Sequence, residues 1–259
     1  MYQAPMQRSI FITGAAAGIG REVAIRFARE GFFCGLYDVD EKGVKELGKL
    51  IGEERTHAAK LDVRDWDGWQ ATVAAFGAAC GKRMDVLFNN AGILRMGWFE
   101  DVSPEECKAQ IDVNLLGVVY GVHAALPLLE RTSGACIVNM SSQSAVYGAP
   151  ELAVYSATKF AVRGLTESLD LELRRKGIRC CDVMPPYVDT GMVRNQTHRA
   201  RTLDTFGVNV TAEEVADVVW KAYKGRKVHW PIGAKTSAFL KLGGLTGLAR
   251  PLARKFTKT

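Results

Sequence analysis

The chain has 259 residues, with 34 Lys and Arg against 28 Asp and Glu, so its formal net charge is +6. The length and the ordinary apolar (47%) and charged (24%) fractions are typical of a globular α/β protein. The basic excess is confined to residues 221–259, which hold ten Lys or Arg and no acidic residue. The preceding residues hold 24 basic and 28 acidic side chains, a net charge of −4, which argues against a nucleic-acid partner.

The cysteines and the N-terminal residues bear on the cellular compartment in which the protein is expected. Six cysteines form no CxxC pair and no Cys/His cluster with metal spacing, so we expect no metal site. The segment 1–5 leads almost at once into a strand pattern without a signal-peptide apolar region, and no apolar run approaches the ~20 residues that span a bilayer. We therefore expect a reducing, cytoplasmic location.

Short apolar runs alternate with segments of helical period along the chain. The predicted strands are 9–13, 32–37, 57–61, 86–89, 135–140, 179–184 and 228–231. The predicted helices are 18–30, 41–51, 66–79, 104–111, 114–131, 152–176 and 212–223. Two of these helices begin with capping boxes, at Ser103 and Thr211. Strands that are apolar throughout and separated by helices predict a doubly wound, Rossmann-type parallel sheet of about seven strands with helices on both faces.

The first predicted strand leads into a glycine-rich turn, TGAAAGIG at 13–20, that opens the first helix. Glycines there allow a tight turn and close approach of the backbone to a pyrophosphate, which the free N–H groups of the helix start can bind. The alternative is a glycine-rich turn with no ligand. The predicted nucleotide contacts are Gly14, Ala17, Gly18, Ile19 and Gly20.

Acidic residues follow the second and third predicted strands. Asp38 can accept hydrogen bonds from both adenosine ribose hydroxyls and would repel a 2′-phosphate. Residues 15–17 are alanines, which offer no cation for such a phosphate, so NAD is favoured over NADP. Asp62 and Val63 could meet the adenine edge, although Asp62 is equally compatible with a turn or a helix cap.

Amide side chains occur at the next strand end and in a later helix. Asn90, Ala91 and Gly92 follow the fourth strand at the carboxyl edge, where open α/β sheets bind ligands, although a plain turn also favours these residues. Asn114 is a polar residue at a helical position among apolar neighbours. It could hold a water that links a catalytic group to solvent, or it could be a satisfied amide that bends the helix.

The strongest chemical signal is Tyr155 with Lys159, four residues apart and hence on one face of a helix. A free tyrosine has a pKa of ~10, and a nearby ammonium favours the phenolate, so the pair suits proton exchange with an alcohol or carbonyl oxygen. Ser142 follows the fifth strand and could hydrogen-bond the same oxygen. A lone YxxxK match recurs by chance, so the surrounding motifs decide its meaning.

Together these motifs resemble the short-chain dehydrogenase/reductase family in its compact single-domain form, over about residues 8–232. The resemblance rests on TGxxxGIG at 13–20, NNAG at 89–92, Asn114, Ser142 and YxxxK at 155–159. It implies a site beside a nicotinamide ring in which Tyr155 is the acid/base and Ser142 orients the substrate oxygen. It further implies that Lys159 lowers the pKa of Tyr155 and binds the nicotinamide ribose, and that Asn114 supports the proton relay.

One segment departs from the family pattern, which often has Pro-Gly after the sixth strand. Here Pro185 is followed by Pro186, which fixes φ and removes an N–H, so the backbone beside the nicotinamide carboxamide could take a different path. Val188 and Thr190 still stand where the carboxamide would be held.

Apolar residues in three segments are candidates for the lining of a substrate pocket, and we expect about half of them to anchor their loops in the core instead. They are Leu94, Met96, Trp98, Val146, Tyr147, Tyr187, Met192 and Phe206. They favour a small hydrophobic alcohol or ketone over a phosphosugar. The longest stretch without clear structure, 185–210, is placed where a substrate loop would lie.

We predict one NAD-binding and catalytic domain, 1–235, and a basic amphipathic tail, 236–259. The tail either packs on its own or a neighbouring subunit, which we favour, or makes peripheral contact with an anionic membrane at the inner surface. The resemblance implies a homodimer or homotetramer formed through helices around 114–131 and 152–176.

The predicted function is reversible hydride transfer between NAD and a secondary alcohol or ketone. Within the enzyme class, the alternative is a 3-oxoacyl-carrier-protein reductase-like activity. From a different class, the alternative is a catalytically silent nucleotide-binding or membrane-docking protein, which degraded catalytic positions would indicate; all four positions are present here.

Overall fold

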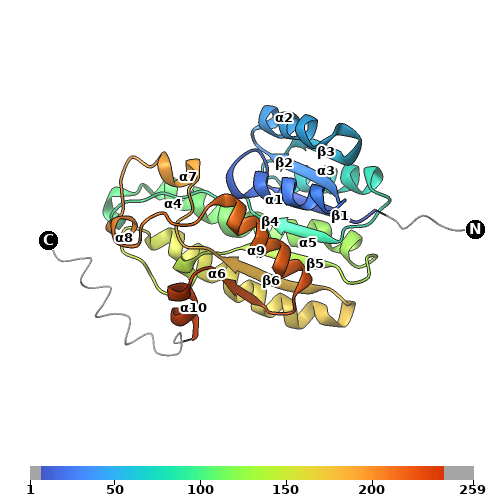
Figure 1. The fold of residues 1–259 in the computed structure, drawn as a ribbon. Helices are drawn as coiled ribbons and strands as arrows, with labels where there is room; N and C mark the ends of the chain where they lie inside the picture. Colours follow the sequence, from blue (N-terminus) through green and yellow to red (C-terminus); the bar gives the residue numbers. More distant parts are fainter. Residues whose placement is uncertain (1–6, 242–259) are drawn as a thin grey trace, which may run out of the picture.

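The computed structural model describes residues 7–241, and within them a seven-stranded parallel sheet of order β3-β2-β1-β4-β5-β6-β7 (Figure 1). The strands are β1 Ser9–Thr13, β2 Phe33–Asp38, β3 Thr56–Lys60, β4 Val86–Asn89, β5 Cys136–Met140, β6 Arg179–Met184 and β7 His229–Pro231. The order reverses between β1 and β4, which places a topological switch point at the centre of the sheet.

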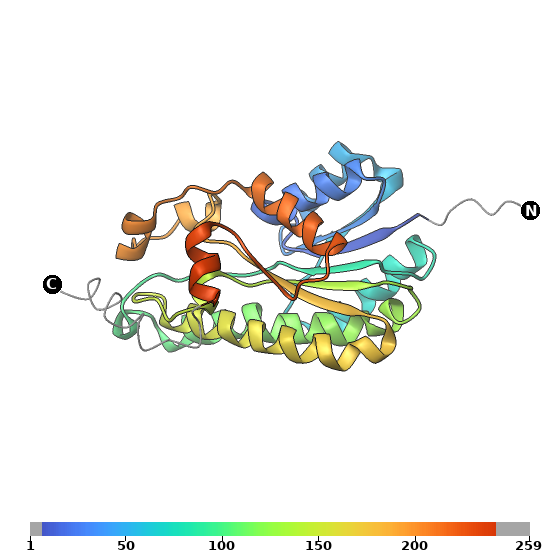
Figure 2. The same cartoon turned by 60° about the horizontal axis from the view of Figure 1, so that its bottom comes forward.

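Helices cover both faces of this sheet, so β1, β4 and β5 are buried along their whole length. On one face lie α1 Gly18–Arg29, α2 Glu41–Ile51 and α9 Ala212–Lys224; on the other lie α3 Trp66–Ala79, α5 Gly117–Leu129 and α6 Ala153–Leu173. Figure 2 shows α5 and α6, in green and yellow, side by side beneath the sheet. Each face carries its own apolar core, which confirms the predicted doubly wound fold.

Helix α4, Pro104–Ile111, differs from the prediction because it does not end before α5. Residues Asp112–Leu116 form a single π-helical turn that joins the two helices into one continuous rod. The stretch Pro104–Leu129 is long and apolar enough to cross a membrane by length and composition, since it contains an 18-residue window with a mean hydropathy of 1.5. In the structure, however, α5 packs on α3, β4 and β5, which is the arrangement of a core helix.

The remaining boundaries follow the predictions closely. Strands shift by one residue at β2 and β3, and both capping boxes form, with Ser103 and Thr211 accepting from the amides of Glu106 and Glu214. The segment predicted to lack structure contains two short helices, α7 Gly191–Arg194 and α8 Arg201–Phe206. A last described helix, α10 Ala234–Lys241, begins the predicted tail; residues 242–259 lie outside the described part.

Candidate active site

The glycine-rich turn between β1 and α1 can be built only from glycine at three positions. Gly14 and Gly18 have φ values of +67° and +54°, a region that other residues rarely adopt. A Cβ at Gly14 would lie 2.8 Å from Asn90 Nδ2, and one at Gly20 would lie 2.1 Å from the Gly14 carbonyl oxygen. The α1 N-cap, Ala17, supplies no side-chain acceptor for the first helical N–H groups. These groups and the bare turn fit a phosphate group.

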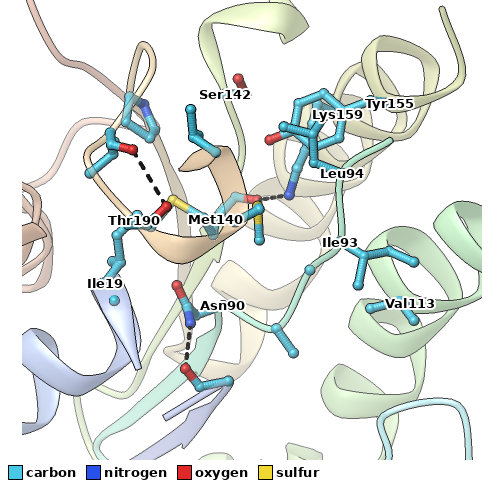
Figure 3. A pocket seen from close by; sticks show the side chains of 18 of the residues that line it. Ile19, Asn90, Ile93, Leu94, Val113, Met140, Ser142, Tyr155, Lys159 and Thr190 are labelled. Atoms are coloured by element: carbon cyan, nitrogen blue, oxygen red, sulfur yellow. Dashed lines mark hydrogen bonds between the residues drawn. The ribbon is translucent and has the colours of Figure 1, made fainter. Parts of the chain in front are cut away.

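Asn90 holds this turn from the neighbouring strand. Its Nδ2 donates to the carbonyl oxygens of Thr13 (3.0 Å) and Gly14 (3.1 Å), while Thr13 Oγ1 accepts from the amides of Asn90 (3.0 Å) and Ala91 (3.1 Å). Figure 3 shows the Asn90 side chain directed at β1. The Asn90 side chain therefore ties β1 to β4 at the switch point.

Asp38 lines the same pocket as the glycine turn, and backbone amides hold its carboxylate in place. Its Oδ2 accepts from the Ala16 amide (3.0 Å) and its Oδ1 accepts from the Asp40 amide (3.1 Å). The adjacent Val39 also lines the pocket and is 58% exposed. The acidic group predicted to select NAD thus lies against the glycine turn and lines the pocket.

Asp62 is paired with a cation that the sequence interpretation did not include. Arg64 contacts it through Nη2 at 2.6 Å and Nε at 2.9 Å, and this pairing holds the pKa of the Asp62 carboxyl below its usual value. Arg64 also lines the pocket. The alanines at 15–17 carry no cation, but the segment after β3 places the Arg64 guanidinium in the pocket, where Asp62 already neutralises it.

Ser142, Tyr155 and Lys159 meet at the carboxyl end of β5 and the start of α6. Figure 3 shows the three side chains around one opening, with the Tyr155 hydroxyl directed toward Ser142. Lys159 Nζ donates to the Met140 carbonyl oxygen at 2.8 Å and lies 5.6 Å from the centroid of the Tyr155 ring. The Ser142 Oγ accepts from the Ser144 amide at 3.1 Å, which fixes the turn that carries it.

The ionisation of this trio differs from the expectation. Burial raises the pKa of Tyr155 to about 12, and the hydrogen bond with Ser142 only partly opposes this effect. Burial also lowers the pKa of Lys159 to about 8. The expectation that Lys159 lowers the pKa of Tyr155 is not met in this structure, since the ammonium contacts a carbonyl and the ring rather than the phenol oxygen.

Asn114 lies behind this trio, in the π-helical turn, and is fully buried. Its Oδ1 accepts from the Ile93 amide at 2.8 Å, and its Nδ2 donates to the Ile93 carbonyl oxygen (2.9 Å) and to Thr158 Oγ1 (3.3 Å). A Cβ at Gly92 would lie 3.2 Å from Asn114 Oδ1 and 3.7 Å from Lys159 Nζ, so the amide and the ammonium flank the same glycine. Asn114 is thus a satisfied amide placed next to Lys159.

The segment after β6 closes the nucleotide side of the pocket. The Pro185 carbonyl oxygen accepts from the Gln143 amide at 2.9 Å, which joins this segment to the Ser142 turn. Val188 is buried and bridges to Val210, and the Thr190 side chain lies against Gly18, where a Cβ would be 3.2 Å from the Thr190 methyl group. Pro185, Val188 and Thr190 all line the pocket together with Pro186.

These features share one pocket of about 520 Å³. Every predicted site residue lines it except Gly20, which packs under the glycine turn, and Asn114. Of the predicted substrate residues, Leu94, Tyr147, Tyr187 and Met192 line the pocket. Met96 and Val146 are instead core residues, as expected for about half of this set, and Trp98 lies outside the lining; the Phe206 side chain is outside the described part.

The structure also adds lining residues that local sequence patterns did not indicate. They include Arg64, Ile93, Gln143, Ala149, Leu152, Val193 and Thr202. Most follow a strand or lie in the 185–210 segment, so only the fold brings them to the pocket. Among the described residues, no group of three or more His, Cys, Asp or Glu side chains could hold a metal ion.

Comparisons with known proteins agree with this geometry. The family model described as short chain dehydrogenase matches residues 8–201. Oxidoreductase UcpA of Salmonella typhimurium is 37% identical over 190 residues, which are 73% of this chain and 72% of that protein. A short chain dehydrogenase/reductase from Burkholderia phymatum in complex with NAD has a TM-score of 0.81 at 27% identity, covering 95% of each chain. A 3-ketoacyl-(acyl-carrier-protein) reductase from Brucella melitensis complexed with NADH has a TM-score of 0.80 at 26% identity, covering 90% of this chain and all of that one. The chain belongs to the short-chain dehydrogenase family and is an oxidoreductase.

Proposed function

We propose that the protein transfers a hydride reversibly between NAD(H) and a secondary alcohol or ketone with an apolar body. One observation carries the proposal: the glycine turn and the Ser142, Tyr155 and Lys159 side chains line a single pocket at the switch point of the sheet. The nicotinamide cofactor would supply or accept the hydride, which no side chain of this chain can do.

The cofactor residues follow from the same geometry. The turn at Gly14 and Gly18 and the first N–H groups of α1 would hold the pyrophosphate, and Asp38 would accept from the adenosine ribose hydroxyls. Because Asp62 already neutralises Arg64, we propose that NAD is preferred over NADP. Comparing kcat/KM for NAD and NADP tests this preference; equal values would contradict it.

The proton chemistry belongs to Tyr155. In the reducing direction its phenol, held protonated by burial, donates to the carbonyl oxygen, which Ser142 orients through its hydroxyl. We propose that Lys159 binds the nicotinamide ribose and that Asn114, on the other side of Gly92, supports return of the proton from solvent.

The substrate end of the pocket is apolar. Leu94, Ala149, Leu152 and Val193 line it, and its polar side chains are uncharged apart from Lys159. Turnover of a series of secondary alcohols of increasing chain length, followed by NADH absorbance, tests the substrate class. We expect kcat/KM to rise with chain length, whereas a preference for short, charged substrates would contradict the proposal.

A second candidate is reduction of a 3-oxoacyl carrier substrate, favoured by the structural likeness to the 3-ketoacyl-(acyl-carrier-protein) reductase from Brucella melitensis. A 3-oxoacyl thioester assayed beside a plain ketone of equal chain length separates the two. A kcat/KM for the thioester that exceeds that of the ketone by about tenfold or more would favour this candidate.

We also propose that the protein is a cytoplasmic homodimer or homotetramer. The outer surface of α6 carries Phe160, 40% exposed, and Leu171, 73% exposed, which a partner subunit could cover. Peripheral contact of the tail with an anionic membrane remains a proposal based on its composition. Native mass measurement tests the subunit count, and sedimentation with anionic vesicles, with and without residues 242–259, tests the membrane contact.

A further inference from the structure

The substrate end of the pocket is covered by residues 191–206, which we call the cover segment; it contains α7 and α8. Its buried Ala200 and Leu203 form one apolar cluster with Leu94 and Leu152, and the catalytic Tyr155 packs against this cluster. Figure 1 shows α7 and α8 at the same end of the molecule as α4. The position of the cover segment therefore bears directly on the wall around Tyr155.

A buried carboxylate outside the pocket lining faces this segment. The Glu151 side chain is 2% exposed, and its Oε2 accepts from the Arg201 amide at 2.6 Å. Its Oε1 lies 3.5 Å from His198 Nε2 and 4.0 Å from Arg201 Nε. All of these contacts come from the cover segment, and a carboxylate removed from water depends strongly on such partners.

The backbone of Glu151 is in an unfavourable conformation. Its φ is +62°, in the left-handed region, where glycine would carry no steric cost. A glutamate at this position retains the strain and places a carboxylate where it meets the cover segment. Strain of this kind is found where surrounding contacts over-determine a functional geometry.

The contacts of Glu151 lead directly to the pocket wall. The residue after Arg201 is Thr202, which is 2% exposed and lines the pocket. Its Oγ1 is 2.7 Å from the Tyr187 hydroxyl, and Tyr187 lines the pocket as well. The Arg201 amide that Glu151 holds is thus one peptide from the side chain that fixes Tyr187.

A second set of hydrogen bonds joins the cover segment to the segment after β4. Gln196 Oε1 accepts from the Met96 amide at 3.2 Å, and its Nε2 donates to the Leu94 carbonyl oxygen at 3.0 Å. The Glu151 carbonyl oxygen accepts from the Gly97 amide at 3.0 Å. The loop before α6, the segment after β4 and the cover segment are therefore hydrogen-bonded into one unit.

We propose that Glu151 is a positioning residue that fastens the cover segment over the substrate end of the pocket and thereby sets the Thr202–Tyr187 wall. The proposal rests on the proposed oxidoreductase function for its kinetic consequence, but the fastening itself is a property of the fold. It concerns the substrate end alone, because the hydrogen bonds and ion pairs of Glu151 among the described residues run to Gly97, His198 and Arg201, not to the glycine turn or Asp38.

Two variants and a matched control test this role. Glu151→Gly removes the carboxylate and relieves the strained φ; Glu151→Gln keeps an acceptor for the Arg201 amide but loses the charge. Asp204→Asn is the control, since it removes an exposed carboxylate of the same segment that pairs with Arg199 at 2.6 Å. We expect the KM for the ketone to rise about tenfold or more in Glu151→Gly, by a smaller factor in Glu151→Gln, and to stay within about twofold in the control. The Kd for NADH should stay within about twofold in all three.

Hydrogen exchange of the amides in residues 191–206 supplies a readout that needs no turnover. We expect faster exchange in Glu151→Gly than in the wild type and in Asp204→Asn, with the Arg201 and Thr202 amides affected most. Unchanged exchange in both Glu151 variants would overturn the proposal, as would an equal loss of NADH and ketone affinity. If the wild type turned over no alcohol or ketone, the proposed function would fail while the exchange result still decided the fastening. Should Glu151→Gly fail to fold, Glu151→Gln carries the test.

Discussion

Burial of the single residue Lys159 in the pocket lowers the stability of the folded protein. The residue is only 4% exposed, and burial lowers the pKa of its ammonium from 10.5 to about 8. Because the folded state disfavours the charged form, the group destabilises the protein at pH 7, where it is protonated both folded and unfolded. The cost is relieved as the pH rises from about 8 toward 10.5, where only the folded state has lost the proton.

Replacing Lys159 by Met should therefore abolish turnover and stabilise the protein. The shift corresponds to roughly 3 kcal/mol, and the loss of the hydrogen bond to the Met140 carbonyl oxygen returns about 1–2 kcal/mol, which leaves a net gain of about 1–2 kcal/mol. Urea unfolding at pH 7 measures it. Lys42→Met, at a position whose side chain is 87% exposed, is the control and should change little. A lower free energy of unfolding in Lys159→Met than in the wild type would show that the ammonium stabilises the folded protein.

Several residues that the sequence analysis singled out do line one pocket, and local sequence features were enough to find them. Tyr155 with Lys159 at helical spacing, Ser142 at a strand end and the glycine turn are each recognisable from local chemistry. Arg64 and Glu151 were missed because their significance lies in partners that only the fold supplies. Nothing in the order of residues shows that Glu151 meets the Arg201 amide fifty residues later.

Among the helices and strands, the π-helical turn is the feature that the hydrophobic periodicity of the sequence did not predict. The pattern predicted two helices, ending at Ile111 and beginning at Asn114, whereas the structure joins them through Asp112–Leu116. The extra residue in the turn directs the Asn114 amide at both backbone groups of Ile93. An insertion of this kind depends on a contact across the fold, so hydrophobic periodicity cannot reveal it.

Asn114→Ala should lower the free energy of unfolding by about 2–4 kcal/mol, because the Ile93 N–H and carbonyl groups lose their buried partner. Urea unfolding again provides the measurement. Gln70→Ala, which removes an exposed amide on α3, should cost less than about 0.5 kcal/mol. If Asn114→Ala lost turnover without losing stability, the amide would serve the proton relay rather than the backbone.

The edge strand β7 is held by a histidine between two carboxylates. His229 Nδ1 lies 2.9 Å from Asp182 Oδ1, and its Nε2 lies 3.0 Å from Glu167 Oε1. Burial lowers the pKa of His229. The hydrogen bond with Asp182 and the charge of Asp182 together raise this pKa by more than burial lowers it, so the net shift is upward from 6.5. A raised folded pKa contributes stability that is fully present below pH 6.5 and is lost as the pH rises through the folded value.

The stabilisation that wild type has over His229→Gln should accordingly shrink as the pH rises above 6.5. Urea midpoints for both proteins at several pH values on either side of 7 measure this difference. His123→Gln, at an exposed position on α5, is the matched control and is measured at the same pH values. A constant difference between wild type and His229→Gln across this range would mean that the histidine is held by packing rather than by charge.

On the scale of the whole molecule, the sheet order explains why distant motifs form one site. The strand order reverses between β1 and β4, so the glycine turn, the segment after β4 and the end of β5 open onto one pocket. The sequence predicted this architecture because parallel strands buried on both faces are apolar along their whole length. It did not predict α7 and α8, whose short helices form only where the apolar cluster around Leu203 supports them.

We propose that Tyr155 transfers the proton in a nicotinamide-dependent oxidation or reduction. Tyr155→Phe removes only the phenol oxygen, so we expect turnover of secondary alcohols to fall by about 10³-fold or more while the Kd for NADH stays within about twofold. Tyr120→Phe, on α5 and outside the pocket lining, should leave both quantities unchanged. Turnover by Tyr155→Phe at a rate near that of the wild type would contradict the account.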